Sequence, residues 1–220
     1  MKSLPGFIAR YAFRPWLERY LSKQRTYRYA NISIQVLPGV FHPGFYFSSK
    51  YLIQHLLQFN LDKKSVLELG AGTGLLSFIV EQHGAKVTAS DLGTKAIENL
   101  LLNKSLLHSN VEVVHSDLFD TLPVCTFDFI VINPPYYPKQ PGSDAALAWY
   151  CGAHFEYFEK LFSELAPFMH AATNLFMVLS EECDLVRIES IARANKFRMQ
   201  EASCKKFWGE SNYIFEVVKN

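Results

Sequence analysis

A short segment near the middle of the chain, Asn133–Tyr137, has residue types that could hold a flat nitrogen group. It reads NPPYY and follows the apolar run Phe127–Ile132. The prolines lack a backbone N–H and keep the preceding residues extended. The Asn133 side-chain oxygen and the Pro134 carbonyl would accept the two hydrogens of a planar NH2 group, while the Tyr136 ring stacks on its plane. Asn133, Pro134 and Tyr136 are therefore the predicted catalytic residues; the alternative is a stiff loop whose tyrosines only pack.

A glycine-rich loop follows the first strand of the predicted sheet. The stretch VLELGAGTGLLS, residues 66–77, places Gly70, Gly72 and Gly74 between a strand and a helix, with Glu68 before them. Glycines let the backbone turn tightly and approach a ligand closely. A dinucleotide fingerprint needs its third glycine at position 75, which is a leucine here. We predict that Glu68 and the three glycines bind a nucleotide-like cofactor, with a plain tight turn as the alternative.

Two acidic residues end the next two predicted strands. Asp91-Leu92 lies in KVTASDLG, 19 residues after Gly72, and Asp117-Leu118 lies in VVHSDLF. A carboxylate at the first position binds both ribose hydroxyls of a nucleotide, and one at the second would accept from an adenine amino group. Each aspartate taken singly also fits a helix N-cap or a turn. Because parallel strands bind ligands at their carboxyl ends, these positions should converge on one crevice, and we predict that Asp91, Leu92, Asp117, Leu118 and Asn133 contact the cofactor there.

The elements that would hold these residues alternate between strands and helices from residue 65 onward. Strands are predicted at Ser65–Leu69, Val87–Ala89, Val111–Val114, Phe127–Ile132 and Asn174–Leu179, and helices at Thr73–His83, Thr94–Leu107, His154–Leu165 and Cys183–Asn195. Two final β runs, Arg198–Ala202 and Tyr213–Val218, are joined by ten residues without a helical pattern, which predicts a hairpin. Such alternation is typical of an α/β fold with a mostly parallel sheet and helices on both faces. Upstream, a strand is predicted at Asn31–Val36, and a helix at Ser48–Phe59 with Ser48 or Ser49 as its N-cap.

The amino-acid composition argues against a metal-binding, disulfide-bonded or membrane-spanning protein. The chain has 220 residues, is 49% hydrophobic and carries a net charge of +1, which suits one packed domain. Its four cysteines form no C-x-x-C pair and its seven histidines show no metal-ligand spacing, so we expect no metal site and a reducing, cytoplasmic location. No apolar run approaches the length that spans a bilayer, and Pro5 and Arg10 interrupt any signal peptide.

The first thirty residues differ from the rest, so we divide the chain into an extension, 1–30, and a domain, 31–220. The extension has seven basic residues against one acid and interleaves them with aromatic side chains. Basic and aromatic residues together can contact phosphates and stack on unpaired bases. We predict a helical extension that packs its aromatic side on the domain with its arginines in solvent; the alternatives are an RNA platform and a contact with a membrane surface or a protein partner.

The motifs ELGAGTG, SDLG, SDLF and NPPYY together resemble those of class I S-adenosylmethionine-dependent methyltransferases. The resemblance runs from about Val40 to the C-terminus. It implies S-adenosylmethionine as cofactor and a Rossmann-like seven-stranded sheet whose last strand is antiparallel. The segments GVFHPGFYFSSKYLIQHL and NPPYYP more narrowly resemble the HemK-like and "methyltransferase small" group, whose members methylate release-factor glutamine or the amino groups of RNA bases. The upstream segment departs from the glutamine-modifying members, which carry acids after its proline.

We therefore expect an N-methyltransferase acting on a planar amino or amide nitrogen, with an RNA base slightly favoured over protein glutamine. The rivals are a dinucleotide-dependent oxidoreductase and a non-catalytic cofactor-binding subunit of a methyltransferase complex. Weaker candidates near the site are His42 and Phe45, for which a simple turn is equally expected, and Trp149, Tyr150, Phe155 and Phe158, which wall the substrate pocket or belong to the core.

Overall fold

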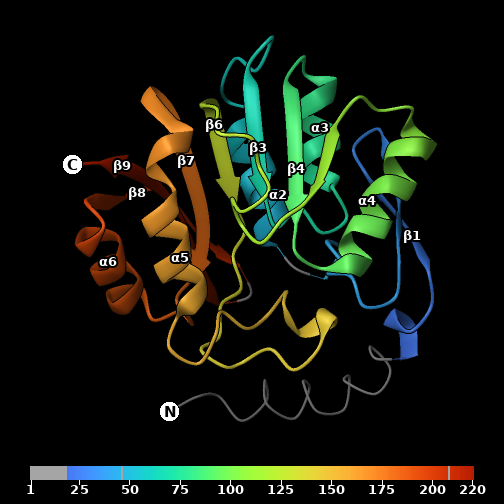
Figure 1. Ribbon diagram of the computed structural model, residues 1–220. Helices are drawn as coiled ribbons and strands as arrows, with labels where there is room; N and C mark the ends of the chain where they lie inside the picture. Colours follow the sequence, from blue (N-terminus) through green and yellow to red (C-terminus); the bar gives the residue numbers. More distant parts are fainter. Residues whose placement is uncertain (1–18, 46, 208) are drawn as a thin grey trace.

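The protein is built around a seven-stranded sheet; the computed structural model describes residues 19–45, 47–207 and 209–220 (Figure 1). The strand order is β5-β4-β3-β6-β7-β9-β8. The strands are β3 (Ser65–Leu69), β4 (Lys86–Asp91), β5 (Glu112–His115), β6 (Phe127–Ile132), β7 (Met169–Ser180), β8 (Phe197–Phe207) and β9 (Glu210–Lys219). Strands β3 to β7 pair in parallel, and β9 is antiparallel to both of its neighbours. The predicted α/β fold with an antiparallel last strand is confirmed.

The final hairpin is longer than predicted. Strands β8 and β9 pair as far as Phe207 and Glu210, so the ten residues expected to connect them mostly belong to the strands. The segment is rich in polar residues because side chains at the end of β8 are exposed rather than packed between helices. Strand pairing there relies on backbone hydrogen bonds, which a polar sequence does not reveal.

Helices cover both faces of the sheet. One face packs against α2 (Ser48–Leu56), α3 (Leu75–Gln82) and α4 (Thr94–Leu107), and the other against α5 (Glu156–Glu164) and α6 (Leu185–Ala194). In Figure 1, α5 lies in front of the sheet and α2 behind it. Adjacent side chains of β6 divide between the two cores, Val131 with the first group and Ile130 and Ile132 with the second. Burial on both faces explains the nearly continuous apolar sequence of this strand.

The described part of the predicted extension, residues 19–30, differs from the prediction. Only residues 19–21 are helical, and Arg25–Tyr29 forms β1, which pairs antiparallel with β2 (Ile32–Val36). The alternating burial of β1 and the fully packed Ile34 of β2 tie this hairpin to the core. The helical prediction was therefore wrong for residues 22–30, where the side chains of β1 alternate between core and solvent. The rest of the extension, residues 1–18, lies outside the described residues.

Two buried asparagines of α4 dock the hairpin onto the domain. Asn99 and Asn103, one helical turn apart, accept from the N–H groups of Leu37 and Gln35 at 2.7 Å. Both amides also donate to the Gln35 carbonyl, and Asn103 donates to the Thr73 carbonyl in the glycine loop at 3.0 Å. These bonds satisfy a strand edge that would otherwise be buried without partners.

Within the described ranges, no helix combines the length and apolar character required to cross a membrane. The same residues contain no group of three or more His, Cys, Asp or Glu side chains placed to hold a metal ion.

Candidate active site

All the predicted site residues except Gly74 line one cavity. It lies at the carboxyl ends of the parallel strands, where the strand order reverses between β3 and β6, and measures about 1540 Å³. Such a reversal leaves a crevice because the connections leave the sheet in opposite directions. Lining residues come from the ends of β3, β4 and β6 and from the segments after β5 and β6. The volume exceeds that of a typical single-ligand pocket, so a cofactor and part of a substrate fit together.

The glycine loop leaves β3 with its backbone exposed to the cavity. Gly70 and Gly72 have φ of 71° and 55°, and no atom lies within 4 Å of the Cβ that another residue would place there. Added side chains would therefore occupy the cavity itself. Gly74, with φ of 77°, is needed for packing, since its added Cβ would come within 2.6 Å of Leu100. The three predicted glycines thus have two different roles: two open the cavity and one closes the helix against the core.

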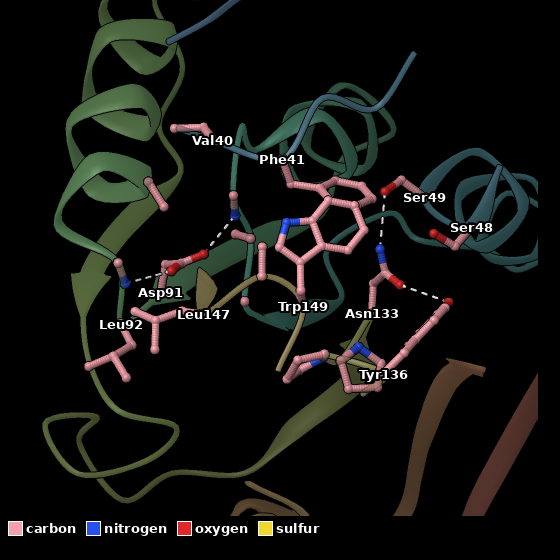
Figure 2. A pocket seen from close by; sticks show the side chains of 18 of the residues that line it. Val40, Phe41, Ser48, Ser49, Asp91, Leu92, Asn133, Tyr136, Leu147 and Trp149 are labelled. Atoms are coloured by element: carbon pink, nitrogen blue, oxygen red, sulfur yellow. Dashed lines mark hydrogen bonds between the residues drawn. The ribbon is translucent and has the colours of Figure 1, made fainter. Parts of the chain in front are cut away.

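Asp91, at the end of β4, holds the loops on either side of it. One carboxylate oxygen accepts from the Gly72 N–H at 2.8 Å, and the other accepts from the Gly93 N–H at 2.8 Å (Figure 2). Each oxygen keeps a second lone pair for a ligand hydroxyl. Burial raises the pKa of Asp91, while the two N–H groups oppose that rise. The neighbouring Leu92 side chain is exposed and lines the same cavity.

Glu68 is buried beneath the glycine loop. One of its oxygens accepts from the backbone N–H of Ser77 at 2.9 Å and from the Ser77 hydroxyl, which fastens β3 to the first turn of α3. Burial raises the pKa of Glu68 to about 8, although the hydrogen bonds from Ser77 act in the opposite direction. Glu68 also lines the cavity, so it supports the loop and remains beside any bound cofactor.

The raised pKa of Glu68 predicts a pH-dependent stability. The folded state favours the protonated acid, so the contribution of this group is complete below its ordinary pKa of 4.5 and is lost as the pH rises towards about 8. Glu68→Gln keeps a neutral acceptor for Ser77 at every pH. Urea unfolding should therefore show wild type losing stability relative to the variant between about pH 5 and 8, by a few kcal/mol in total. Parallel pH profiles of the two proteins would contradict the assignment.

Asp117 and Leu118, after β5, form a second wall of the cavity. Lys160 of α5 places its ammonium 2.8 Å from one Asp117 oxygen and 2.7 Å from Asp120. This ion pair orients the Asp117 carboxylate and leaves its other oxygen available to a ligand amino group. Leu118 has a φ of 51°, which turns the chain sharply, and its side chain is buried in the second core. Sequence reasoning did not identify Lys160, since an Asp–Lys pair 43 residues apart has no local signal.

The Asn133 tip is held by its neighbours. The Asn133 amide donates to the Ser49 hydroxyl of α2 at 3.4 Å, and the Tyr136 hydroxyl donates to the Asn133 oxygen at 3.4 Å (Figure 2). Asn133 is half-buried, while Pro134 and Pro135 are buried. Burial raises the pKa of Tyr136, so its phenol stays protonated and remains a donor. The N-cap of α2 is Phe47, with no side-chain hydrogen bond, so neither Ser48 nor Ser49 caps the helix as predicted.

The aromatic candidates divide between the cavity and the core. Trp149 and Tyr150 line the cavity, and the Trp149 ring lies 5.5 Å from that of Phe41 between their centroids. Phe158 is fully buried in the second core, and Phe155 packs against it. Trp149 and Tyr150 therefore wall the pocket, whereas Phe155 and Phe158 belong to the core.

His42 and Phe45 flank a turn at Pro43-Gly44. The Gly44 N–H donates to the His42 ring at 3.1 Å, and the Phe45 N–H donates to the His42 carbonyl at 3.1 Å. His42 is buried beside the Tyr20, Tyr27 and Phe45 rings, and burial lowers its pKa. Phe45 lines the cavity. The turn is confirmed, and a part in the site is supported for Phe45 rather than for His42.

Comparison with known proteins agrees with this geometry. The sequence profile of the family "Methyltransferase small domain" matches residues 31–151. A putative protein N5-glutamine methyltransferase of Methanocaldococcus jannaschii is 34% identical over 49% of this chain and 52% of its own length. Ribosomal RNA small subunit methyltransferase C of Hamiltonella defensa is 30% identical over 53% of this chain and 34% of its own length. This chain thus spans about half the length of the first relative and about a third of the second.

Solved structures share the fold. Mtq2 in the E. cuniculi Mtq2–Trm112 complex, which methylates the eRF1 translation termination factor, superposes with a TM-score of 0.63 at 21% identity, over 83% of this chain and 99% of that one. The T. thermophilus 16S rRNA N2 G1207 methyltransferase RsmC, solved with AdoMet and guanosine, superposes with a TM-score of 0.64 at 20% identity, over 88% of this chain and 50% of that one.

The glycine loop and the Asp91 carboxylate give the cavity a shape and chemistry that fit S-adenosylmethionine. The backbone at Gly70 and Gly72 opens onto free space, and the Asp91 oxygens, facing the cavity beside this loop, keep lone pairs for ribose hydroxyls. The family match covers more than half of the chain and includes the glycine loop, both aspartates and the NPPYY tip. The cofactor is S-adenosylmethionine, and the chain belongs to the methyltransferase small domain family.

Proposed function

We propose that this protein is an N-methyltransferase that acts on a planar amino or amide nitrogen. The observation that carries the proposal is the position of Asn133. Its oxygen lies at the end of β6 in the same cavity as the glycine loop of β3, and neighbouring hydrogen bonds orient its amide. A substrate nitrogen held there would be next to the cofactor site.

In this proposal the chain positions the nitrogen and removes no proton itself. S-adenosylmethionine supplies a methyl group on a sulfonium when it is bound. The Asn133 oxygen has one lone pair for the Tyr136 hydroxyl and another for a substrate hydrogen, while the Pro134 carbonyl would accept the second hydrogen. These bonds strengthen as the nitrogen becomes positive, so they stabilise the transition state more than the ground state. An amide is no general base, so once the N–C bond had formed and the carbon–sulfur bond to the methyl group had broken, the nitrogen would give its proton to water.

We favour an RNA base as the substrate and keep protein glutamine as the second candidate. Trp149 and Phe41 offer flat apolar surfaces in the cavity on which a base would stack. The relatives support both substrates, since one is named for ribosomal RNA and the other for N5-glutamine. Both groups carry a planar NH2.

A labelling experiment separates the two substrates. The protein is incubated with S-adenosylmethionine carrying a labelled methyl group and with separated RNA, protein and small-molecule fractions. We expect label in RNA, recovered as an N-methylated base after nuclease digestion. Label recovered as methylglutamine would support the second candidate, and label on carbon or oxygen atoms would contradict the proposal of N-methylation. Asn133→Ala, expected to methylate about 10²–10³ times more slowly, provides the matched control.

We also propose that basic residues of 1–30 hold RNA. Arg19, Lys23 and Arg28 are exposed, whereas Arg25 donates to the Tyr20 carbonyl at 3.0 Å and lies 4.0 Å from the centroid of its ring. Replacing the three exposed residues by glutamine should flatten the slope of log affinity against log salt by about 2, at roughly 0.7 per charge for single strands. The slope is measured by filter binding of RNA at salt concentrations from about 50 to about 300 mM.

A control variant separates local contact from overall charge. Lys63, Lys86 and Lys219 are exposed, and glutamine at all three removes the same charge away from the extension. Its salt slope should remain that of wild type. If the two triple variants gave equal salt slopes, residues 19–30 would have a purely structural role.

A further inference from the structure

The segment between the NPPYY tip and α5 crosses the cavity as a strap, which we define as residues 138–149. Its two ends are joined, because the Tyr137 N–H donates to the Trp149 carbonyl and the Cys151 N–H to the Tyr137 carbonyl, both at 2.9 Å. The Tyr137 hydroxyl also donates to Glu182 at 2.8 Å, which fastens this base near the end of β7. The base of the strap is therefore anchored beside the catalytic tip.

The middle of the strap is anchored on the opposite side of the cavity by Asp144. One Asp144 oxygen accepts from the Thr94 N–H at 3.0 Å; the other accepts from the Lys95 N–H at 3.0 Å and from the Thr94 hydroxyl at 3.3 Å. These donors belong to the first turn of α4, whose own N-cap is Gly93 and has no side chain. Asp144 thus caps a helix that begins 50 residues earlier in the chain.

Between these anchors the strap lies over the cavity. Leu147 and Trp149 line the cavity, and in Figure 2 the Trp149 indole lies between the Asp91 carboxylate and the Asn133 amide. Across the cavity, the Phe41 ring meets Trp149. The strap therefore adds side chains to the cavity between its Asp91 end, which we call the cofactor half, and its Asn133 end, which we call the substrate half.

The N-terminus of α4, where Asp144 is bound, also lies in the cofactor half of the cavity. Gly93, immediately before α4, donates to Asp91, the residue predicted to bind ribose. The Gly93 backbone lies so close to the strap that an added Cβ would meet Asp144 at 3.4 Å. A shift of the strap would therefore disturb the helix turn that holds Asp91.

We propose that Asp144 is a positioning residue for cofactor binding, which it supports by fastening the strap across the cavity. Release of Asp144 from α4 opens the strap and accompanies entry and exit of the cofactor. The proposal rests on the cofactor site described above and on no particular methyl acceptor. Because a ligand binds only the fraction of molecules in the competent conformation, loss of the anchor lowers the apparent affinity.

Asp144→Ala tests this role without requiring turnover. Calorimetry with S-adenosylhomocysteine should give a dissociation constant about 2- to 30-fold higher than wild type, the loss expected when an N-cap side chain is removed. Stopped-flow displacement should show faster dissociation, and hydrogen exchange should accelerate in residues 144–151. Asp144→Asn keeps one oxygen acceptor and should lie between wild type and Asp144→Ala.

Asp184→Ala is the matched control. Asp184 also caps a helix, accepting from the Arg187 N–H of α6 at 3.0 Å, and it is exposed. This variant should lose stability while its dissociation constant stays that of wild type. A wild-type dissociation constant and wild-type exchange in Asp144→Ala, or equal weakening in both variants, would overturn the role of the strap. Failure of wild type itself to bind S-adenosylhomocysteine would overturn the cofactor site and this proposal with it.

Discussion

Asn133→Ala is expected to lower the methylation rate by about 10²–10³, the usual loss when one preorganised partner of a transition state is removed. Asn133 is half-buried at the end of β6 and its side-chain oxygen already accepts from Tyr136, so its position is set before a substrate arrives. Its contact is to the substrate nitrogen, so cofactor affinity should change little. Single-turnover rates with the labelled cofactor, together with calorimetry, measure both quantities.

Two further variants separate acceptor chemistry from loop shape. Asn133→Asp keeps an acceptor of the same size and adds negative charge beside a nitrogen that becomes positive, so it should retain much more activity than alanine. Ser49→Ala removes only the partner of the Asn133 amide and should cost less than Asn133→Ala. Both replacements at position 133 keep an ordinary residue before Pro134, so the backbone restriction is the same. A wild-type rate for Asn133→Ala would remove Asn133 from the mechanism.

Asp91→Ala is expected to weaken S-adenosylmethionine binding by about 1.5–3 kcal/mol, the range for hydrogen bonds to a charged group. The carboxylate would hold the ribose hydroxyls with the lone pairs that Gly72 and Gly93 leave free. Its loss also releases both loops, which adds to the effect. Calorimetry with S-adenosylmethionine gives the affinity, and tight NADH binding without S-adenosylmethionine binding would contradict the assignment.

Asp128 provides a control with similar local chemistry at the other end of the sheet. It accepts from the Ser65 N–H and hydroxyl at 2.9 Å and pairs with Lys64 at 3.2 Å. These bonds hold the pKa of Asp128 below its usual range. Asp128→Ala should therefore reduce stability and leave cofactor affinity unchanged. Similar losses of affinity in both aspartate variants would mean that Asp91 acts only through folding.

The sequence alone determined the fold class and the residues that meet in the cavity. Runs of apolar residues followed by Gly70, Asp91, Asp117 and Asn133 mark strand ends, and parallel strands bring those ends to one edge. The glycine loop and the proline tip are local features, since φ restrictions and missing donors act on adjacent residues. Such properties can be recognised in a linear chain.

The tertiary structure decided how those residues are supported. Ser49, Lys160 and Asp144 each contact a site element that is distant in the chain, and such side chains have no local signature. The structure also corrected the helical prediction for residues 22–30. There β1 gains stability by pairing with β2, and β2 in turn docks onto Asn99 and Asn103 of α4. A polar amide in a helix predicts no partner by itself. Only packing brings these donors and acceptors within hydrogen-bonding distance, because the connections between them span tens of residues.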